Sequence, residues 1–89
     1  MADAYKVTAD TDAAVLVSGS GYTQSAPKRA IVKVVGSTTV YLGGANVDST
    51  DGFSVPQNGV VEVEAWGDNH VWVVTASSTS VVSVLASGS

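Results

Sequence analysis

Alternation of apolar and polar side chains is most regular in the stretch VVEVEAWGDNHVWVVTA, which spans residues 60–76. Successive side chains of a strand point to opposite faces, so the aliphatic residues from Val61 to Ala65 share one face. A three-residue turn at Gly67-Asp68-Asn69 pairs Trp66 with His70. This register predicts a β-hairpin with its aliphatic residues on one side and both tryptophans, the histidine and both glutamates on the other. A two-residue loop would mix the faces, because a slip of one residue flips every side chain.

The other apolar runs are short and are separated by glycine, serine, asparagine or proline. No segment keeps the 3.6-residue period of a helix over ten residues. The runs at 29–35 and 38–42 flank Gly36-Ser37 and resemble a second hairpin. About seven short strands, with turns every eight to twelve residues, predict an all-β fold, a small antiparallel β-sandwich or barrel. The remaining strands are expected at residues 13–17, 53–56 and 80–86.

Residues 1–12 are short and polar and are predicted to form an N-terminal arm, with 5–8 as a candidate edge strand. Residues 13–89 are then the β-sandwich domain. A chain of 89 residues makes one small domain. Small folds without disulfides often gain stability by forming oligomers, so self-association is expected.

Composition narrows the classes of partner. The net charge is −4, with 4 Lys+Arg against 8 Asp+Glu, which argues against nucleic acid as a partner because phosphates require a basic surface. No cysteine is present, so disulfides and thiolate metal sites are excluded. Charged residues are only 13% of the chain, so much of its surface consists of hydroxyl and methyl groups. Removing water from such a surface when a protein partner binds costs little free energy. No secretory n-region or long apolar run is found, so neither export nor a membrane-spanning segment is expected.

Candidate catalytic and metal-binding residues all have simpler interpretations. His70 is the single histidine, and no motif supplies it with a nucleophile or base partner. The segment Asp48–Gly52 resembles a calcium loop but has too few acidic ligands, and its aspartates match turn chemistry. Glu62 and Glu64 are two apart on one strand, as on an ordinary solvated face. The sequence therefore predicts no catalytic residue, no metal, no cofactor and no enzymatic activity.

The two tryptophans have two interpretations that the residues alone leave open. Trp66 and Trp72 fill the core of the sandwich, or they lie on an outward face with His70 as anchors of an interface. An outward pair is also suited to stacking sugars, whereas its acidic neighbours disfavour nucleic-acid bases. Together with Tyr5 on the arm, these three residues are the candidate interface residues.

The segment Val40–Gly44 (VYLGG), the asparagine–valine–aspartate stretch after it and Gly52–Pro56 (GFSVP) resemble a small β domain of structural proteins from tailed bacteriophages, especially those of actinobacteria. That family continues with an acidic strand, an aromatic- or aliphatic-rich strand and a closing Val-x-Val-Leu strand. The resemblance covers about two-thirds of the chain, residues 30–88. The corresponding strands here are residues 61–65, 71–77 and 82–85.

The resemblance implies a virion component made in the host cytoplasm, and a free-standing copy of this size favours a capsid decoration (cement) protein on the capsid surface. The implied partners are the major capsid protein and further copies of the chain, with a trimer favoured. The implied mechanism is mechanical: copies bridge neighbouring capsid subunits, and a mobile arm orders on docking. The alternative is a head-fibre or tail-associated module that binds a glycan or receptor. No catalytic residues are carried over.

Overall fold

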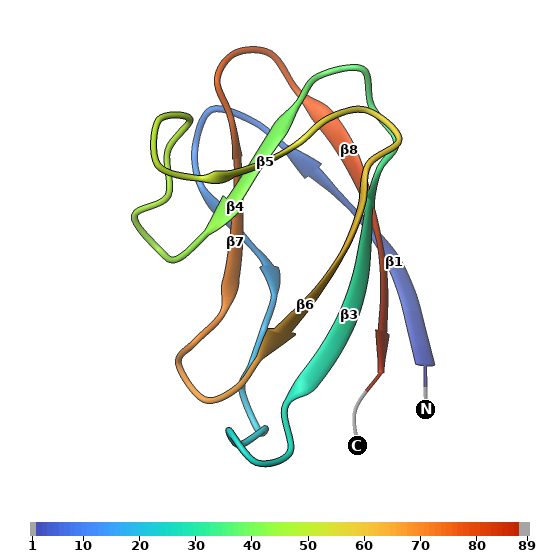
Figure 1. The fold of residues 1–89 in the computed structure, drawn as a ribbon, viewed down its shortest axis with the longest axis vertical. Helices are drawn as coiled ribbons and strands as arrows, with labels where there is room; N and C mark the ends of the chain where they lie inside the picture. Colours follow the sequence, from blue (N-terminus) through green and yellow to red (C-terminus); the bar gives the residue numbers. More distant parts are fainter. Residues whose placement is uncertain (1, 88–89) are drawn as a thin grey trace.

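The computed structural model describes residues 2–87, which form eight β-strands and no helix (Figure 1). This confirms the predicted all-β class and adds one strand to the expected number. The described residues contain no helix long and apolar enough to cross a membrane. The strands are β1 (Ala2–Ala9), β2 (Ala14–Val17), β3 (Lys28–Val34), β4 (Val40–Gly43), β5 (Phe53–Val55), β6 (Val60–Ala65), β7 (Val71–Thr75) and β8 (Ser80–Ser87).

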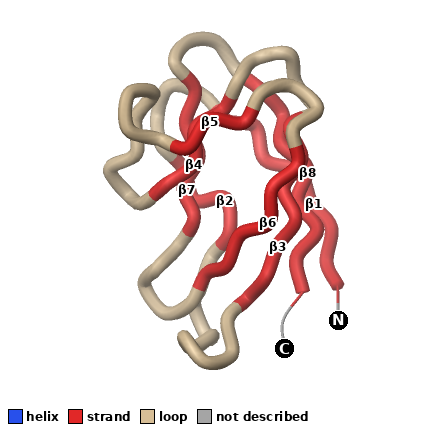
Figure 2. The backbone as a smooth tube through the Cα atoms, in the orientation of Figure 1, coloured by secondary structure: helices blue, strands red, loops and turns tan. Residues whose placement is uncertain are grey.

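The strands make two four-stranded antiparallel sheets that face each other as a sandwich (Figure 2). The first sheet has the order β1-β8-β3-β6 and the second has the order β2-β7-β4-β5. Consecutive strands lie in opposite sheets except for β4 and β5, which pair with each other. This order is that of an eight-stranded jelly roll, a double-sheet architecture of two Greek keys.

The core between the sheets consists of small aliphatic side chains. Each strand of the first sheet contributes alternate residues, as in β3, where Ala30, Val32 and Val34 are buried and their neighbours are exposed. The buried core cluster contains only valine, alanine and leucine, so neither tryptophan is part of it. Valine suits this role because its branched side chain packs well on a pleated surface.

A β-bulge in β2 adds an extra inward residue to the core. The register with β7 shifts between Val15 and Val17, which pair with adjacent residues of β7. As a result, Leu16 and Val17 are both buried, although successive residues of a regular strand point to opposite faces.

Both predicted hairpins are wrong, because their strands lie in different sheets. β6 pairs with β3, whereas β7 pairs with β2 and β4. Likewise β3 pairs with β6 and β8, whereas β4 pairs with β5 and β7. A chain that crosses between sheets keeps the same alternation as a hairpin, since in both cases one face of each strand is covered. The alternation therefore does not distinguish the two connections.

The segment predicted as an arm is an integral strand over residues 2–9. β1 pairs with β8 along its whole length, from Ala2 opposite Ser87 to Ala9 opposite Ser80. Ala9 is fully buried in the core, and the first residue of β1 and the last residue of β8 are paired with each other (Figure 1). Met1 lies outside the described residues. The edge-strand alternative for residues 5–8 is the one that the structure confirms.

Replacing Leu16 with alanine tests the contribution of the bulge to the core. Leu16 is 2% exposed, so we expect Leu16→Ala to lower the free energy of unfolding by about 2–5 kcal/mol in urea titrations. The matched control is Leu85→Ala at a side chain that is 48% exposed, with an expected loss of about 1 kcal/mol or less. Equal losses in the two variants would contradict the burial described here.

Candidate binding surfaces

The turn between β6 and β7 is a tight two-residue turn. Asn69 N–H donates to the carbonyl oxygen of Trp66 at 2.8 Å, and Trp66 N–H donates back to Asn69 at 3.3 Å. Gly67 takes a φ of 55°, in the left-handed region that favours glycine. Trp66 thus opposes Asn69, and the predicted pairing of Trp66 with His70 is wrong.

The loop between β2 and β3 supports this turn from the side. Gly67 N–H donates to the carbonyl oxygen of Tyr22 at 3.0 Å. Gly19 N–H donates to Nδ1 of His70 at 2.9 Å, which makes that nitrogen an acceptor and leaves the proton of a neutral ring on Nε2. A Cβ atom on Gly19 would lie 2.3 Å from the backbone nitrogen of Trp66. The closeness of the two backbones therefore requires glycine at position 19.

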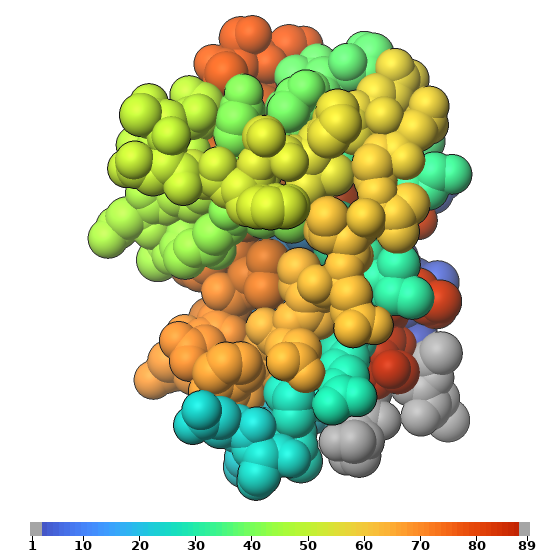
Figure 3. All heavy atoms as spheres, viewed as in Figure 1, coloured from blue at the N-terminus to red at the C-terminus, as the bar shows by residue number. Residues whose placement is uncertain are grey.

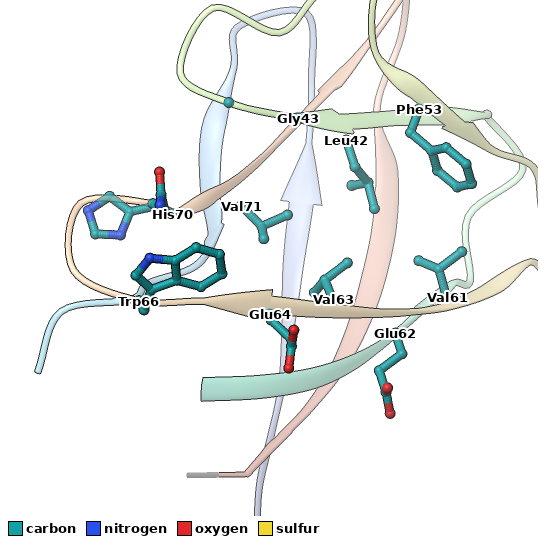
Figure 4. A pocket seen from close by; sticks show the side chains of 12 residues that line it. Leu42, Gly43, Phe53, Val61, Glu62, Val63, Glu64, Trp66, His70 and Val71 are labelled. Carbon is teal, nitrogen blue, oxygen red and sulfur yellow. The ribbon is translucent and has the colours of Figure 1, made fainter. Parts of the chain in front are cut away.

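A groove of about 740 Å³ opens between the two sheets, next to the turn (Figure 4). Side chains of Val61, Val63 and Trp66 point into it from the β6 side, whereas Glu62 and Glu64 point away. The space-filling view shows the surface indented between the green to yellow-green β4–β5 region and the orange turn after β6 (Figure 3). The opposite wall and the end near the turn are formed by Leu42, Gly43, Gly44, Phe53, Asn69, His70 and Val71.

The structure separates the two tryptophans. Trp66 and His70 are half-buried at one end of the groove, where the structure brings them together. Trp72 is half-buried on the outer face of the second sheet, opposite Gly43 on one side and Val15 on the other. The predicted single face with both tryptophans, the histidine and the glutamates is therefore wrong. The role of each residue in an interface stays a prediction.

Tyr5 connects the two sheets. It is half-buried against the core, and its hydroxyl donates a hydrogen bond to the carbonyl oxygen of Leu16 at 2.7 Å. Burial, and secondarily the negative charge of Asp3, raise the pKa of the Tyr5 hydroxyl above its usual value of 10.0. The ring therefore contributes to the packing of β1 on β2, a role that the sequence did not indicate.

The outer face of the first sheet carries apolar side chains that sequence analysis did not single out. Ile31 and Leu85 lie side by side in the register and are 44% and 48% exposed. Val35 and Val60 are exposed on the same sheet. The available signal was the run RAIVKVV, which is apolar on both faces except for Arg29 and Lys33. A strand of this kind either is buried on both faces or presents an apolar face to a partner.

Charged side chains lie beside and within this apolar patch, because Lys33 pairs with Val60 and Glu62 pairs with Ile31. The register aligns Lys6 of β1, Ser83 of β8 and Lys33 of β3 across the sheet. Arg29 lies two residues before Ile31, and its Nε is 3.1 Å from a carboxylate oxygen of Glu64 on β6. Three of the four basic residues of the chain thus lie on this face, against two glutamates. The other basic residue, Lys28, is outnumbered by six aspartates elsewhere, so this face is the most basic part of an acidic molecule.

A scan against protein-family models finds no match, and a search of the curated proteins finds none either. Within residues 2–87, no three histidine, aspartate or glutamate side chains are grouped so that they could hold a metal ion. The arguments for function therefore rest on the surfaces described above.

Replacing Gly19 with alanine tests the support of the β6–β7 turn. The added Cβ meets the Trp66 backbone, so we expect Gly19→Ala to lower the free energy of unfolding by about 1–3 kcal/mol and to shift the tryptophan fluorescence. Gly44→Ala is the matched control, because a Cβ there meets nothing within 4 Å, and its effect should stay within about 0.5 kcal/mol. Destabilisation of Gly44→Ala together with an unchanged stability of Gly19→Ala would contradict the close packing of Gly19 against the Trp66 backbone.

Replacing Tyr5 with phenylalanine tests the link between β1 and β2. Loss of the hydrogen bond to Leu16 should lower the free energy of unfolding by about 1 kcal/mol at neutral pH. The raised pKa means that the folded state holds the phenolic proton more tightly than the unfolded state. This stabilisation is fully present below pH 10.0 and is lost as the pH rises through the folded-state pKa. Urea titrations between pH 8 and pH 12 should therefore show a smaller alkaline loss of stability for Tyr5→Phe than for the wild type.

Proposed function

We propose that this chain is a non-enzymatic capsid decoration protein, which binds an assembled phage shell through the outer face of its first sheet and stabilises that shell. The observation that carries the proposal is the exposed apolar patch of Ile31, Val35, Val60 and Leu85 with its flanking lysines. Contiguous exposed apolar surface rimmed by polar residues marks protein–protein interfaces.

The charge distribution favours an acidic protein surface as the partner. Lys6, Arg29 and Lys33 lie on the face of the patch against Glu62 and Glu64, whereas the rest of the molecule carries one basic residue against six aspartates. Complementary charges speed the encounter with an acidic surface and orient the sandwich on it, and the apolar side chains then supply burial. Under this proposal the acidic surface belongs to the major capsid protein of the shell.

Two further points support a viral structural role. Jelly rolls occur in viral capsid domains and in lectins, so the topology is compatible with a virion component, although this is an analogy at the level of the fold. The phage resemblance includes β4 and β5, the one pair of strands that is consecutive in the chain and adjacent in a sheet. Its VYLGG segment contains β4, and its GFSVP segment contains β5.

The proposed mechanism is mechanical. Copies that bind only the assembled shell lower its free energy relative to the separated subunits by mass action. The rigid sandwich presents a nearly continuous sheet surface that bridges neighbouring capsid subunits. Self-association on the capsid surface, with a trimer favoured by the resemblance, is part of the proposal, and light scattering of the purified chain measures it.

Co-sedimentation with phage capsids assembled without this chain tests the proposal, before and after shell expansion. We expect saturable binding to expanded shells and greater resistance of those shells to heat. Leu85→Glu places a charge in the patch and should weaken binding at least about tenfold. Phe53→Glu is the matched control, because Phe53 is 64% exposed but lies at the groove, and it should bind as the wild type does.

Absence of binding to both shell forms would overturn the proposal. Binding of the chain to host-surface glycans under those conditions would establish the alternative, a head-fibre or tail-associated receptor-binding module. Equal weakening by Leu85→Glu and Phe53→Glu would show that the outer face is not the contact surface.

A further inference from the structure

Strand β6 forms one edge of the first sheet and carries no lysine, proline or bulge along that edge. All six of its residues, from Val60 to Ala65, pair with β3 in an unbroken register. Within residues 2–87 no strand pairs with its other side. Edge strands are commonly blocked by charged side chains (lysine above all), by proline or by a bulge, and of these the sequence VVEVEA contains only two glutamates, which point away from the space between the sheets. Its outer backbone groups are therefore available for another strand.

The groove between the two sheets, called the cleft from here on, lies directly beside this edge. Its walls are mostly apolar, with Val61, Val63 and Trp66 from the β6 side and Leu42 and Phe53 from the second sheet (Figure 4). Phe53 is 64% exposed although it points into this space, because nothing in the described chain covers it. The volume of about 740 Å³ is typical of a cleft that accepts a ligand.

The combination of a free edge and an apolar cleft favours an extended peptide. A strand added to β6 would place every second side chain into the cleft, beside Val61 and Val63. Its other side chains would lie on the outer surface, beside Glu62 and Glu64. At about 3.3 Å per residue, the six residues of β6 match a segment of about 20 Å.

The negative charges of Glu62 and Glu64 favour a partner with basic residues and disfavour pairing with the β6 strand of a second copy of the chain. Glu62 and Glu64 point away from the cleft and are exposed. The antiparallel pairings of two β6 strands that overlap most fully and keep their valine faces together set Glu62 against a glutamate of the other copy, and like charges opposite each other destabilise a sheet. Lysine or arginine at those positions would instead form favourable cross-strand pairs.

We infer that the β6 edge and its cleft form a second binding site, for an extended peptide segment of a partner protein in which apolar residues alternate with lysine or arginine. The site adds this segment as a fifth strand of the first sheet and fills the space between the sheets. It lies at the side of the sandwich, whereas the proposed shell contact uses the outer face of the first sheet. The inference therefore does not depend on the capsid proposal.

Fluorescence polarisation with the isolated chain and three labelled hexapeptides tests the site. We expect saturable binding of Lys-Val-Lys-Val-Lys-Val, with quenching of Trp66, at least about tenfold tighter than binding of Lys-Lys-Lys-Val-Val-Val. The two peptides carry the same charge, so non-specific attraction to an acidic protein cancels. Glu-Val-Glu-Val-Glu-Val should bind weakly because it meets the glutamates of β6.

Substitutions of exposed side chains test the site without changing the buried core. Glu62→Lys should reduce the preference for the lysine peptide over the glutamate peptide at least about tenfold. Phe53→Ala should weaken binding of the lysine peptide, and the matched control Val35→Ala, on the outer face, should leave it unchanged. Thermal melting confirms that each variant is folded.

Each of three results would overturn the inference: no binding of the alternating peptide, equal binding of the alternating and block peptides, or self-association of the chain that excludes the peptide and is abolished by Phe53→Ala. The last result would identify a second copy as the occupant. Because the experiment uses no shells, its failure leaves the capsid proposal standing, and failure of shell binding leaves this site standing.

Discussion

The structure depends on burial of one face of each strand against an opposite sheet. The core cluster contains only valine, alanine and leucine, so the sheets are held together by small side chains. The hydrophobic effect is proportional to the area buried, and small side chains bury enough only when every strand takes part. This explains why β1 is paired along its full length with β8 and why the bulge of β2 directs both Leu16 and Val17 inward.

A core without aromatic residues leaves the larger side chains for surfaces. Trp66 and Phe53 line the cleft between the sheets, Trp72 lies on the outer face of the second sheet, and Tyr5 closes the packing of β1 on β2. Within residues 2–87 no strand lies beyond β6 at the cleft, and hydrogen bonds from Gly19 to His70 and from Gly67 to Tyr22 anchor the turn that follows β6. The same crossings between sheets that build the core thus leave one side of the sandwich open.

The two binding surfaces differ in the physics of recognition. The outer face of the first sheet is broad and carries three basic residues against two glutamates, and under the capsid proposal it meets a folded acidic surface that is bound by area and charge. The β6 edge is narrow and acidic, and it suits an extended segment that is bound by backbone hydrogen bonds and alternate side chains.

The sequence by itself determined the all-β class, most strand positions and the inward and outward faces of β6, because period-two alternation reports burial directly. Tertiary structure alone decided how the strands are joined. A turn such as Gly67-Asp68 is compatible with a hairpin or with a crossing between sheets, and only long-range pairing of β6 with β3 and of β7 with β2 and β4 selects the crossing.

For the same reason the sequence placed both tryptophans on one face, whereas the structure separates them. Sequence also did not reveal that Ile31 and Leu85 are neighbours, because residues far apart in the chain come together only when β8 lies beside β3.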